Sequence, residues 1–190
     1  YEAIMQENPS TFKKGNAPVE SVRWTDAMEF CFKLNGMSVI PPGLGLGKPP
    51  AGYQFTLPTE AQWEYACRAG VAGRIADEQL VGMAVAYMRN GIPFDEPQRV
   101  GSKNANAWGL YDMLGNVEEW CLDIYRPYPR GPVVDPVGQG GGRDHVIRGG
   151  AYMNSNVGPI HNLRAAVRDK HSGYAQYRGF RLAAVKITEK

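Results

Sequence analysis

Residues 106–120 read N-A-W-G-L-Y-D-M-L-G-N-V-E-E-W and combine a turn, a candidate cation loop and a large aromatic side chain. Oxygen atoms that could converge on one cation recur at positions i, i+3, i+5 and i+7: the carboxylates of Asp112 and Glu119 and the main-chain carbonyls of Gly115 and Val117. Calcium typically binds about six to eight such oxygens, some of them from water. In the alternative interpretation Asp112 caps a turn and Glu119 is solvated, and the spacing alone leaves both open.

Length and composition indicate one loop-rich domain that covers residues 1–190. A chain of 190 residues with 43% hydrophobic content can build one well-buried core but not a second. The 23 glycines, 14 prolines and 11% aromatic residues are typical of irregular backbone held by Trp and Tyr side chains. The net charge of +2 and the lack of a basic run argue against nucleic acid as a partner. No apolar run approaches the roughly 20 residues of a membrane span.

Two helices are predicted in the first half of the chain. Thr25 can cap a helix that ends at Asn35-Gly36, and residues 59–62, T-E-A-Q, form a capping box for a second helix that ends at Gly70. Three cysteines, none of them in a CxxC pair, indicate neither a disulfide framework nor a zinc site, although one bridge remains open: Cys31, Cys67 and Cys121. The first two fall on apolar helix faces, so we expect them to be buried.

Short strands are predicted in the second half and between the helices. Their expected ranges are 53–57, 85–88, 99–101, 146–152 and 179–184, and the Pro- and Gly-rich residues 131–142 are expected to form a loop. Helices towards the front and strands towards the end indicate an α+β domain.

Six sequence blocks, taken in order, resemble the formylglycine-generating enzyme (sulfatase-modifying factor) family. They are N-P-S-x-F at 8–12, P-V-E-x-V-x-W at 18–24, L-P-T-E-A-Q-W-E-Y-A at 57–66, the loop at 106–120, V-I-R-G-G at 146–150 and R-G-F-R at 178–181. The resemblance implies an elaborated C-type-lectin-like fold with sparse regular secondary structure. It also implies an extracytoplasmic protein, periplasmic or secreted, and places a further N-terminal strand segment before Tyr1.

The same resemblance assigns a structural calcium ion to the loop that matches Asp112, Gly115, Val117 and Glu119. The outer two residues would supply side-chain oxygens and the inner two would supply carbonyls. The family usually has Asn at the first position, and the extra charge of Asp112 should favour the ion. A second calcium site of the family would use residues 85–95, where the pattern does not match residue by residue.

The site of catalysis departs from the family pattern. The oxidases of this family use two cysteines shortly after the Arg-Gly-Gly motif, first as copper ligands and then to convert a substrate cysteine to formylglycine, and thiolates are ligands that Cu(I) prefers. Four positions of that site differ here: Ala151 replaces a serine, Asn154 and about Pro159 replace the cysteines, and Glu118 replaces an aromatic residue. The sequence therefore predicts neither formylglycine generation nor a copper site.

Residues 152–177 are instead suited to recognition of a protein or a small ligand. Tyr, Asn and Ser side chains bind adaptably at low entropic cost, and the candidate ligand-binding residues are Tyr152, Asn154, Asn156, His161, Tyr174 and Tyr177. This part of the chain forms the ligand-binding face in the variable proteins of diversity-generating retroelements. Alternatively, Tyr152 and Tyr177 pack the domain and the polar residues solvate a loop. We therefore expect an accessory or interaction module, or a subunit of a larger assembly.

An enzyme remains the second hypothesis. Glu118, Asn154 and His161 could form a polar pocket in which a carboxylate acts as a general base, as in a cysteine-independent, oxidase-like enzyme of periplasmic maturation. Four arginines are predicted to satisfy carbonyls of irregular backbone instead: Arg148, Arg164, Arg168 and Arg181.

Overall fold

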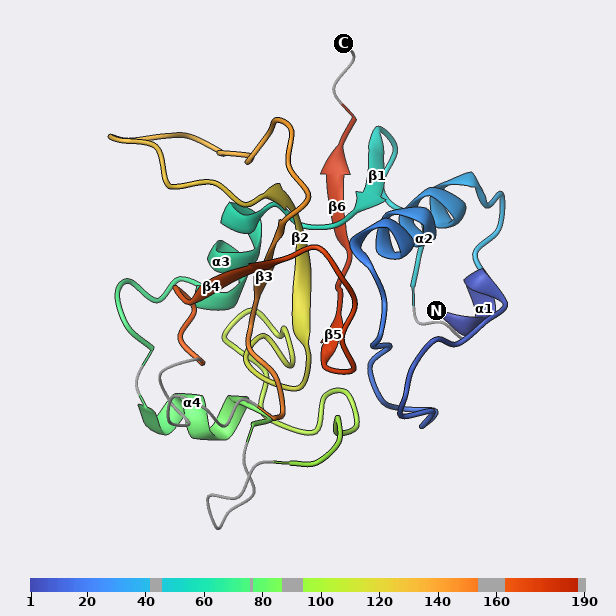
Figure 1. The fold of residues 1–190 in the computed structure, drawn as a ribbon, viewed down its shortest axis with the longest axis horizontal. Coiled ribbons are helices and arrows are strands. Elements are labelled where there is room, and N and C mark those ends of the chain that lie inside the picture. The colour runs from blue at the N-terminus through green and yellow to red at the C-terminus, as the bar shows by residue number, and fades with distance from the viewer. Residues whose placement is uncertain (42–45, 76, 87–93, 154–162, 188–190) are drawn as a thin grey trace.

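A central sheet of four strands organises the described part of the protein (Figure 1). The computed structural model describes residues 1–41, 46–75, 77–86, 94–153 and 163–187. The strand order is β4-β3-β2-β5, with β2 at Glu118–Ile124, β3 at His145–Arg148, β4 at Arg168–His171 and β5 at Arg178–Gly179. The β2–β3 and β3–β4 pairs are antiparallel, whereas β2 and β5 are parallel. A separate antiparallel ribbon joins β1 (Tyr53–Thr56) to β6 (Ala183–Lys186), which lie far apart in the sequence.

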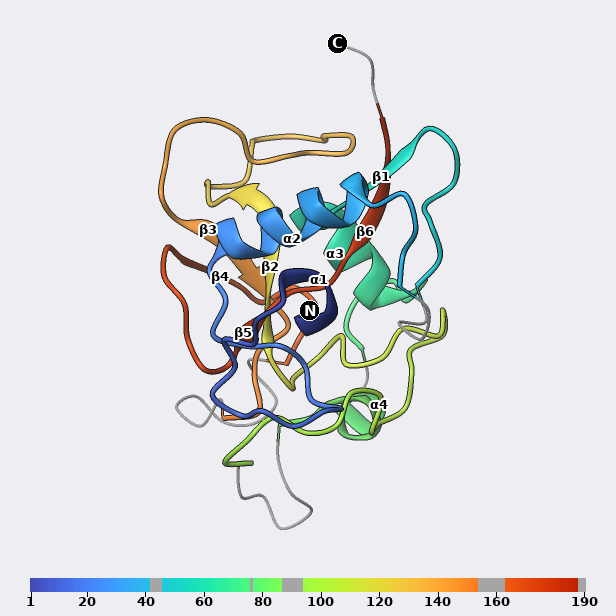
Figure 2. The same cartoon turned by 90° about the vertical axis from the view of Figure 1, so that its right-hand side faces the viewer.

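The described helices are short and surround the sheet (Figures 1 and 2). They are α1 (Glu2–Met5), α2 (Trp24–Gly36), α3 (Glu60–Arg68) and α4 (Asp77–Met83). The capping box of α3 is confirmed, because Thr59 Oγ1 accepts the Gln62 N–H at 3.2 Å and Gln62 Oε1 accepts the Thr59 N–H at 2.9 Å. None of the described helices has the length and apolar character needed to cross a membrane.

One helix start and several strands differ from their predicted positions. Helix α2 begins at Trp24 rather than after a Thr25 cap, because the Asp26 carboxylate accepts the Arg23 N–H at 2.8 Å. The strand predicted at 146–152 stops at Arg148, since Gly149 and Gly150 have φ of 94° and 70°. In the range 179–184, Gly179 ends β5 and residues 183–184 begin β6, with no strand between them. Residues 100–101 form a turn, and of 85–88 only Val85 makes a described bridge, to Gly115. Helix α4 was not predicted.

Two tryptophans anchor the core. Trp63 of α3 and Trp120 of β2 are almost completely buried, and Trp120 Nε1 donates to the Val22 carbonyl at 3.0 Å. All three cysteines are buried and free, so the bridge that the sequence left open is not formed. The mixture of short helices and strands confirms the α+β class and its sparse regular structure.

Candidate functional site

Glu119, the last residue of the predicted calcium loop, is held by two neighbours. Its Oε2 accepts hydrogen bonds from Trp63 Nε1 at 2.6 Å and Arg181 Nε at 2.5 Å, and its Oε1 accepts Arg181 Nη2 at 2.6 Å. Glu119 is therefore neither solvated nor free. Because a carboxylate has about four lone-pair directions, one direction on Oε1 remains for a further partner.

Asp112, at the start of that loop, is the residue whose bonding is incomplete. Its backbone is left-handed with φ of 52°, and its Oδ2 accepts the Gly101 N–H at 2.8 Å. Its Oδ1 is buried and has no hydrogen-bond partner among the described residues. An orphaned buried carboxylate oxygen is costly unless something binds it, so Asp112 fits a cation ligand.

The predicted calcium loop lies beside a cavity of about 470 Å³. Asp112, Val117 and Glu119 border this cavity. Gly115 lies against Val85, where an added Cβ would overlap the Val85 carbonyl, and its φ of 81° also requires glycine. The described chain contains no group of three His, Cys, Asp or Glu residues that could hold a metal ion. A cation in this loop would therefore depend on carbonyl oxygens and water as well as on the carboxylates.

Glu118, the neighbour of Glu119 on β2, forms a buried ion pair. Its Oε2 accepts Arg178 Nη2 at 2.9 Å and Arg178 Nε at 3.2 Å, and the Arg178 guanidinium lies 5.0 Å from the Trp120 ring centroid. Burial raises the pKa of Glu118, and Arg178 opposes that shift. Glu118 also borders a cavity of about 220 Å³ together with Gly149, Gly150 and Asp169. An acidic group thus occupies the position where the family resemblance predicts an aromatic ring.

The predicted recognition segment is only partly a surface. Tyr152 is completely buried and packs edge-to-face on Phe12 with ring centroids 6.2 Å apart, so its assignment as a ligand-binding residue is corrected to a core residue. Tyr174 is 59% exposed, and Tyr177 is half-buried beside Arg178. Asn154, Asn156 and His161 lie outside the described residues. Strand β4 was also missed within this segment.

Arg148 confirms the prediction that arginines fasten irregular backbone. Its Nη1 donates to the carbonyls of Ala165 and Val167, at 2.5 and 3.0 Å, while Nε and Nη2 bind Glu60 and Glu64 at 3.0 and 2.6 Å. Arg168 adds two hydrogen bonds to Glu60 and one to the Arg126 carbonyl. The sequence predicted the arginines as internal hydrogen-bond donors but did not predict Glu60 and Glu64 as their acceptors. The available signal was the i, i+4 spacing of these two glutamates, which places both on one face of α3.

Comparison with known proteins identifies the family. Residues 3–186 match the model of the sulfatase-modifying factor enzyme 1-like domain. The chain belongs to this family. It is similar to the formylglycine-generating enzyme of Streptomyces coelicolor, with 36% identity over 73% of this chain and 43% of that enzyme. It thus spans less than half the length of that relative.

Two other relatives have names that differ from that of the enzyme. The chaperone protein LppX of Paenibacillus barcinonensis is 27% identical over 88% of this chain and 75% of that protein. The inactive C-alpha-formylglycine-generating enzyme 2 of Mus musculus is 26% identical over 82% of this chain and 44% of that protein.

Solved structures confirm the fold. Treponema denticola variable protein 1 superposes with a TM-score of 0.76 and 29% identity, over 98% of this chain and 80% of that chain. PvdO from Pseudomonas aeruginosa gives 0.72 and 25%, over 93% and 65% of the two chains. The elaborated C-type-lectin-like fold expected from the sequence agrees with these neighbours.

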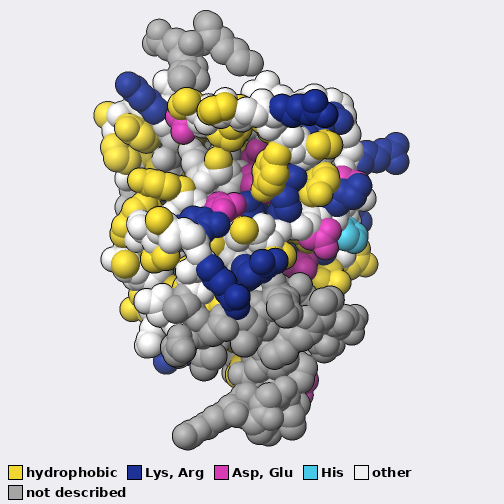
Figure 3. Space-filling view, turned by 90° about the vertical axis from the view of Figure 1, so that its left-hand side faces the viewer, with side chains coloured by type: hydrophobic (Ala, Val, Ile, Leu, Met, Phe, Trp, Pro, Cys, Tyr) yellow, Lys and Arg dark blue, Asp and Glu magenta, His cyan; other side chains and the backbone are white. Residues whose placement is uncertain are grey.

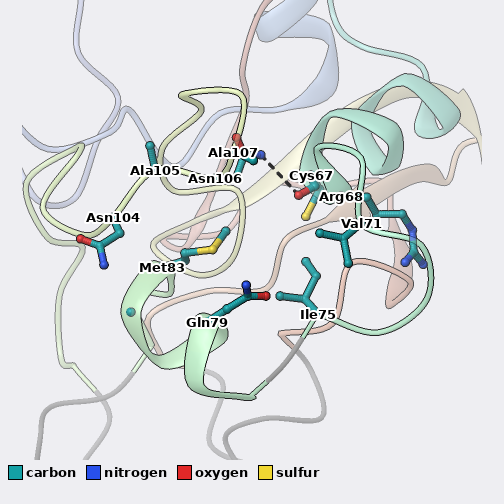
Figure 4. Close-up of a pocket in the computed structure, with 11 residues that line it drawn as sticks. Cys67, Arg68, Val71, Ile75, Gln79, Met83, Asn104, Ala105, Asn106 and Ala107 are labelled. Carbon is teal, nitrogen blue, oxygen red and sulfur yellow. Dashed lines mark hydrogen bonds between the residues drawn. The ribbon is translucent and has the colours of Figure 1, made fainter.

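All three cysteine thiols of this chain are buried away from solvent. Cys67 lies beside a cavity of about 270 Å³, and its carbonyl accepts a hydrogen bond from the Asn106 side chain at 3.3 Å (Figure 4). Burial raises the pKa of Cys67 to about 12 and that of Cys31 to about 11, and it raises the pKa of Cys121 well above its ordinary value. The thiolate is the form of cysteine that acts as nucleophile and metal ligand. Because their raised pKa values keep these three thiols protonated near neutral pH, none of them is suited to replace the two cysteines that the family's oxidases have after the Arg-Gly-Gly motif.

Proposed function

We propose that this chain is a binding module of the sulfatase-modifying factor family that has no formylglycine-generating activity. The loss of the cysteine pair after Arg148-Gly149-Gly150 carries the proposal, and the burial of Cys31, Cys67 and Cys121 supports it. The Glu118–Arg178 ion pair supports it further, since a charged pair stands where the resemblance to the family predicts an aromatic side chain. The domain would act as an accessory protein outside the cytoplasm or as a subunit of a larger assembly.

The surface around Tyr174 is the proposed binding face for a protein or small ligand. Tyr174 combines high exposure with the Arg23 guanidinium 5.8 Å from its ring centroid, and exposed Tyr and Arg side chains are common anchors of recognition. Relatives named as a chaperone and as an inactive enzyme are consistent with a role in binding. The proposal extends to Tyr177 and to Asn154, Asn156 and His161, but no longer to Tyr152.

Calcium is proposed as the structural ion of the 112–119 loop. Asp112 Oδ1 is a buried side-chain oxygen with no hydrogen-bond partner among the described residues, and Glu119 Oε1 keeps one free lone-pair direction. The carbonyls of Gly115 and Val117 would complete the protein ligands. Bound calcium would neutralise the Asp112 carboxylate and cross-link the loop, whereas copper has no proposed role in this chain.

The loss of activity is tested by incubating the protein with Cu(I), oxygen and a sulfatase-type peptide that contains one cysteine. We expect no aldehyde product by mass spectrometry, because no accessible pair of thiols is present to bind copper. The Streptomyces coelicolor enzyme is the positive control under the same conditions. Turnover of the peptide above the copper-only background would overturn the proposal.

A second candidate function is a cysteine-independent enzyme in which Glu118 is the base. The observation in its favour is the position of Glu118 at the edge of a cavity beside Gly149 and Gly150, with its pKa raised by burial. Carbon-13 NMR titration of the Glu118 carboxyl carbon should give an apparent pKa above that of a free glutamate side chain, about 4.3. A value at or below that figure would remove Glu118 as a base that works near neutral pH.

A further inference from the structure

A groove on the α3 side of the molecule is distinct from the calcium loop and the Tyr174 face, and the buried Arg148–Glu60–Glu64 network forms part of its floor. It has a volume of about 830 Å³ and lies between α3 and the segment 126–139 that follows β2. Its apolar lining includes Tyr65, Ile124, Pro127, Tyr128, Val133 and Val137. Figure 3 views the molecule from this side and shows hydrophobic side chains interspersed with those of Lys and Arg. The groove shares none of the residues assigned to the calcium loop or the Tyr174 face.

Large apolar side chains around the groove are exposed to solvent. Tyr65 on α3 is 68% exposed, Tyr128 on the opposite wall is 61% exposed, and Val133 is 50% exposed; Val134, which follows it outside the lining, is 90% exposed. A single exposed apolar residue is ordinary, but a group of them around one hollow is typical of an interaction site. Trp108 packs against one side of Tyr65, with ring centroids 4.9 Å apart, and the Arg168 guanidinium lies 4.2 Å from the Tyr128 ring centroid, but both tyrosines keep most of their surface in solvent.

The outer wall of the groove is fastened to the sheet. The Gly138 N–H donates to Asp123 Oδ1 at 2.6 Å, and the Gly138 carbonyl accepts the Ile124 N–H at 2.8 Å. A Cβ at Gly138 would overlap the Ile124 carbonyl, so glycine is required for this close approach. The wall is therefore anchored to β2 at Gly138, and ordering one end of a segment before binding reduces the entropic cost of binding.

The charges that remain available at the groove are positive. Each acidic lining residue already accepts hydrogen bonds from arginine side chains or main-chain N–H groups: Glu60, Glu64 and Asp123. Arg126 donates to a main-chain carbonyl, and Arg130, between the lining residues Pro129 and Gly131, is exposed. Neither Arg126 nor Arg130 has a carboxylate partner within the described ranges. The rim can therefore accept an anionic group without first losing an internal ion pair.

We propose that this groove binds an extended peptide segment of a partner protein in which a large apolar side chain stands next to a carboxylate. The apolar side chain would be buried between Tyr65 and the 126–139 wall, and the carboxylate would bind Arg126 or Arg130. Arginine matches carboxylates in planar two-bond geometry, and aromatic walls bury apolar anchors with little loss of entropy. This proposal does not depend on the Tyr174 face or on the calcium loop.

The test uses a fluorescein-labelled decapeptide with a central Leu-Phe pair flanked by two aspartates on each side. Fluorescence anisotropy with the full chain should show saturable binding. The double variant Arg126→Glu/Arg130→Glu and the single variant Tyr65→Ser should each weaken binding at least tenfold. The matched control is Phe32→Ser, which removes a 79% exposed aromatic side chain on α2 and should leave the affinity unchanged. Circular dichroism checks that every variant is folded.

A second peptide, in which lysines replace the four aspartates, tests the charge preference and should bind at least tenfold more weakly. Absence of saturable binding, equal affinity for the two peptides, or equal losses in Tyr65→Ser and Phe32→Ser would overturn the proposal. Analytical ultracentrifugation tests whether a second copy of the chain, rather than a partner peptide, occupies the groove. Self-association that Val134→Asp abolishes would assign this face to a second copy of the chain and would likewise overturn the peptide proposal.

Discussion

Removal of calcium is expected to lower the melting temperature by roughly 5–11 °C. A ligand that binds only the folded state at 100 times its Kd stabilises that state by about 2.7 kcal/mol, and each kcal/mol corresponds to about 2–4 °C in a domain of this size. Asp112 is the proposed source of the effect, because its buried Oδ1 has no hydrogen-bond partner among the described residues. Differential scanning calorimetry with excess calcium and then with chelator measures the shift.

Asp112→Ala should abolish the sensitivity to chelator, since the substitution removes both the ligand and the orphaned oxygen. The matched control is Asp144→Ala, which removes an exposed carboxylate paired with Lys170 at 3.3 Å. That variant should keep the full response to chelator. Identical melting curves for the wild-type protein in calcium and in chelator would contradict the assignment of calcium to this loop.

Local sequence patterns correctly predicted the two longer helices, because helix caps and apolar periodicity depend on residues within a few positions of one another. The Thr59–Gln62 capping box set the start of α3 because both of its hydrogen bonds form within one turn. The apolar periodicity of the two longer helices placed Cys31 and Cys67 in the core. The family motifs supplied the fold, since six ordered blocks constrain topology more strongly than periodicity does.

Contacts between distant segments could not be predicted in the same way. Glu118 pairs with Arg178 because the parallel β2–β5 pairing places these residues opposite each other, 60 positions apart in the chain. For Tyr152 the sequence left two interpretations open, ligand binding or packing of the domain, and the structure shows the second, since Tyr152 is buried against Phe12. Neither outcome has a local signal, because each depends on which strands lie together.

The strands predicted at 99–101 and 85–88 are not formed as predicted, and the reason is again that pairing between distant segments has no local signal. Val100 is preceded and followed by residues compatible with a strand, but its N–H donates to the Asn16 carbonyl in a turn rather than to a neighbouring strand. Val85 forms one bridge with Gly115 because glycine allows the two backbones to come into contact. Strand propensity identifies segments that fit a sheet and does not identify the partner.

Arg148→Ala is expected to destabilise the protein by about 3–5 kcal/mol, the typical cost of removing one partner from a buried ion-pair network. This corresponds to a melting temperature lower by roughly 6–20 °C. The Arg148 side chain is 1% exposed and binds two glutamates and two carbonyls, so the substitution leaves buried acceptors without donors. Chemical denaturation at pH 7 measures the loss. Lys33→Ala, which breaks an exposed pair with Glu29, is the control and should cost less than about 1 kcal/mol.

The cost of Arg148→Ala should also depend on pH. Burial alone would raise the pKa of Glu64, but hydrogen bonds from Arg148 and Arg68 outweigh it and hold the pKa below its usual value. A carboxyl group with a lowered folded-state pKa contributes stability above its unfolded pKa, about 4.3, and loses it as the pH falls through the folded value. The stability difference between wild type and Arg148→Ala should therefore narrow from pH 7 to pH 3. A constant difference over this range would mean that Arg148 acts through its carbonyl contacts and not through its pairing with Glu64.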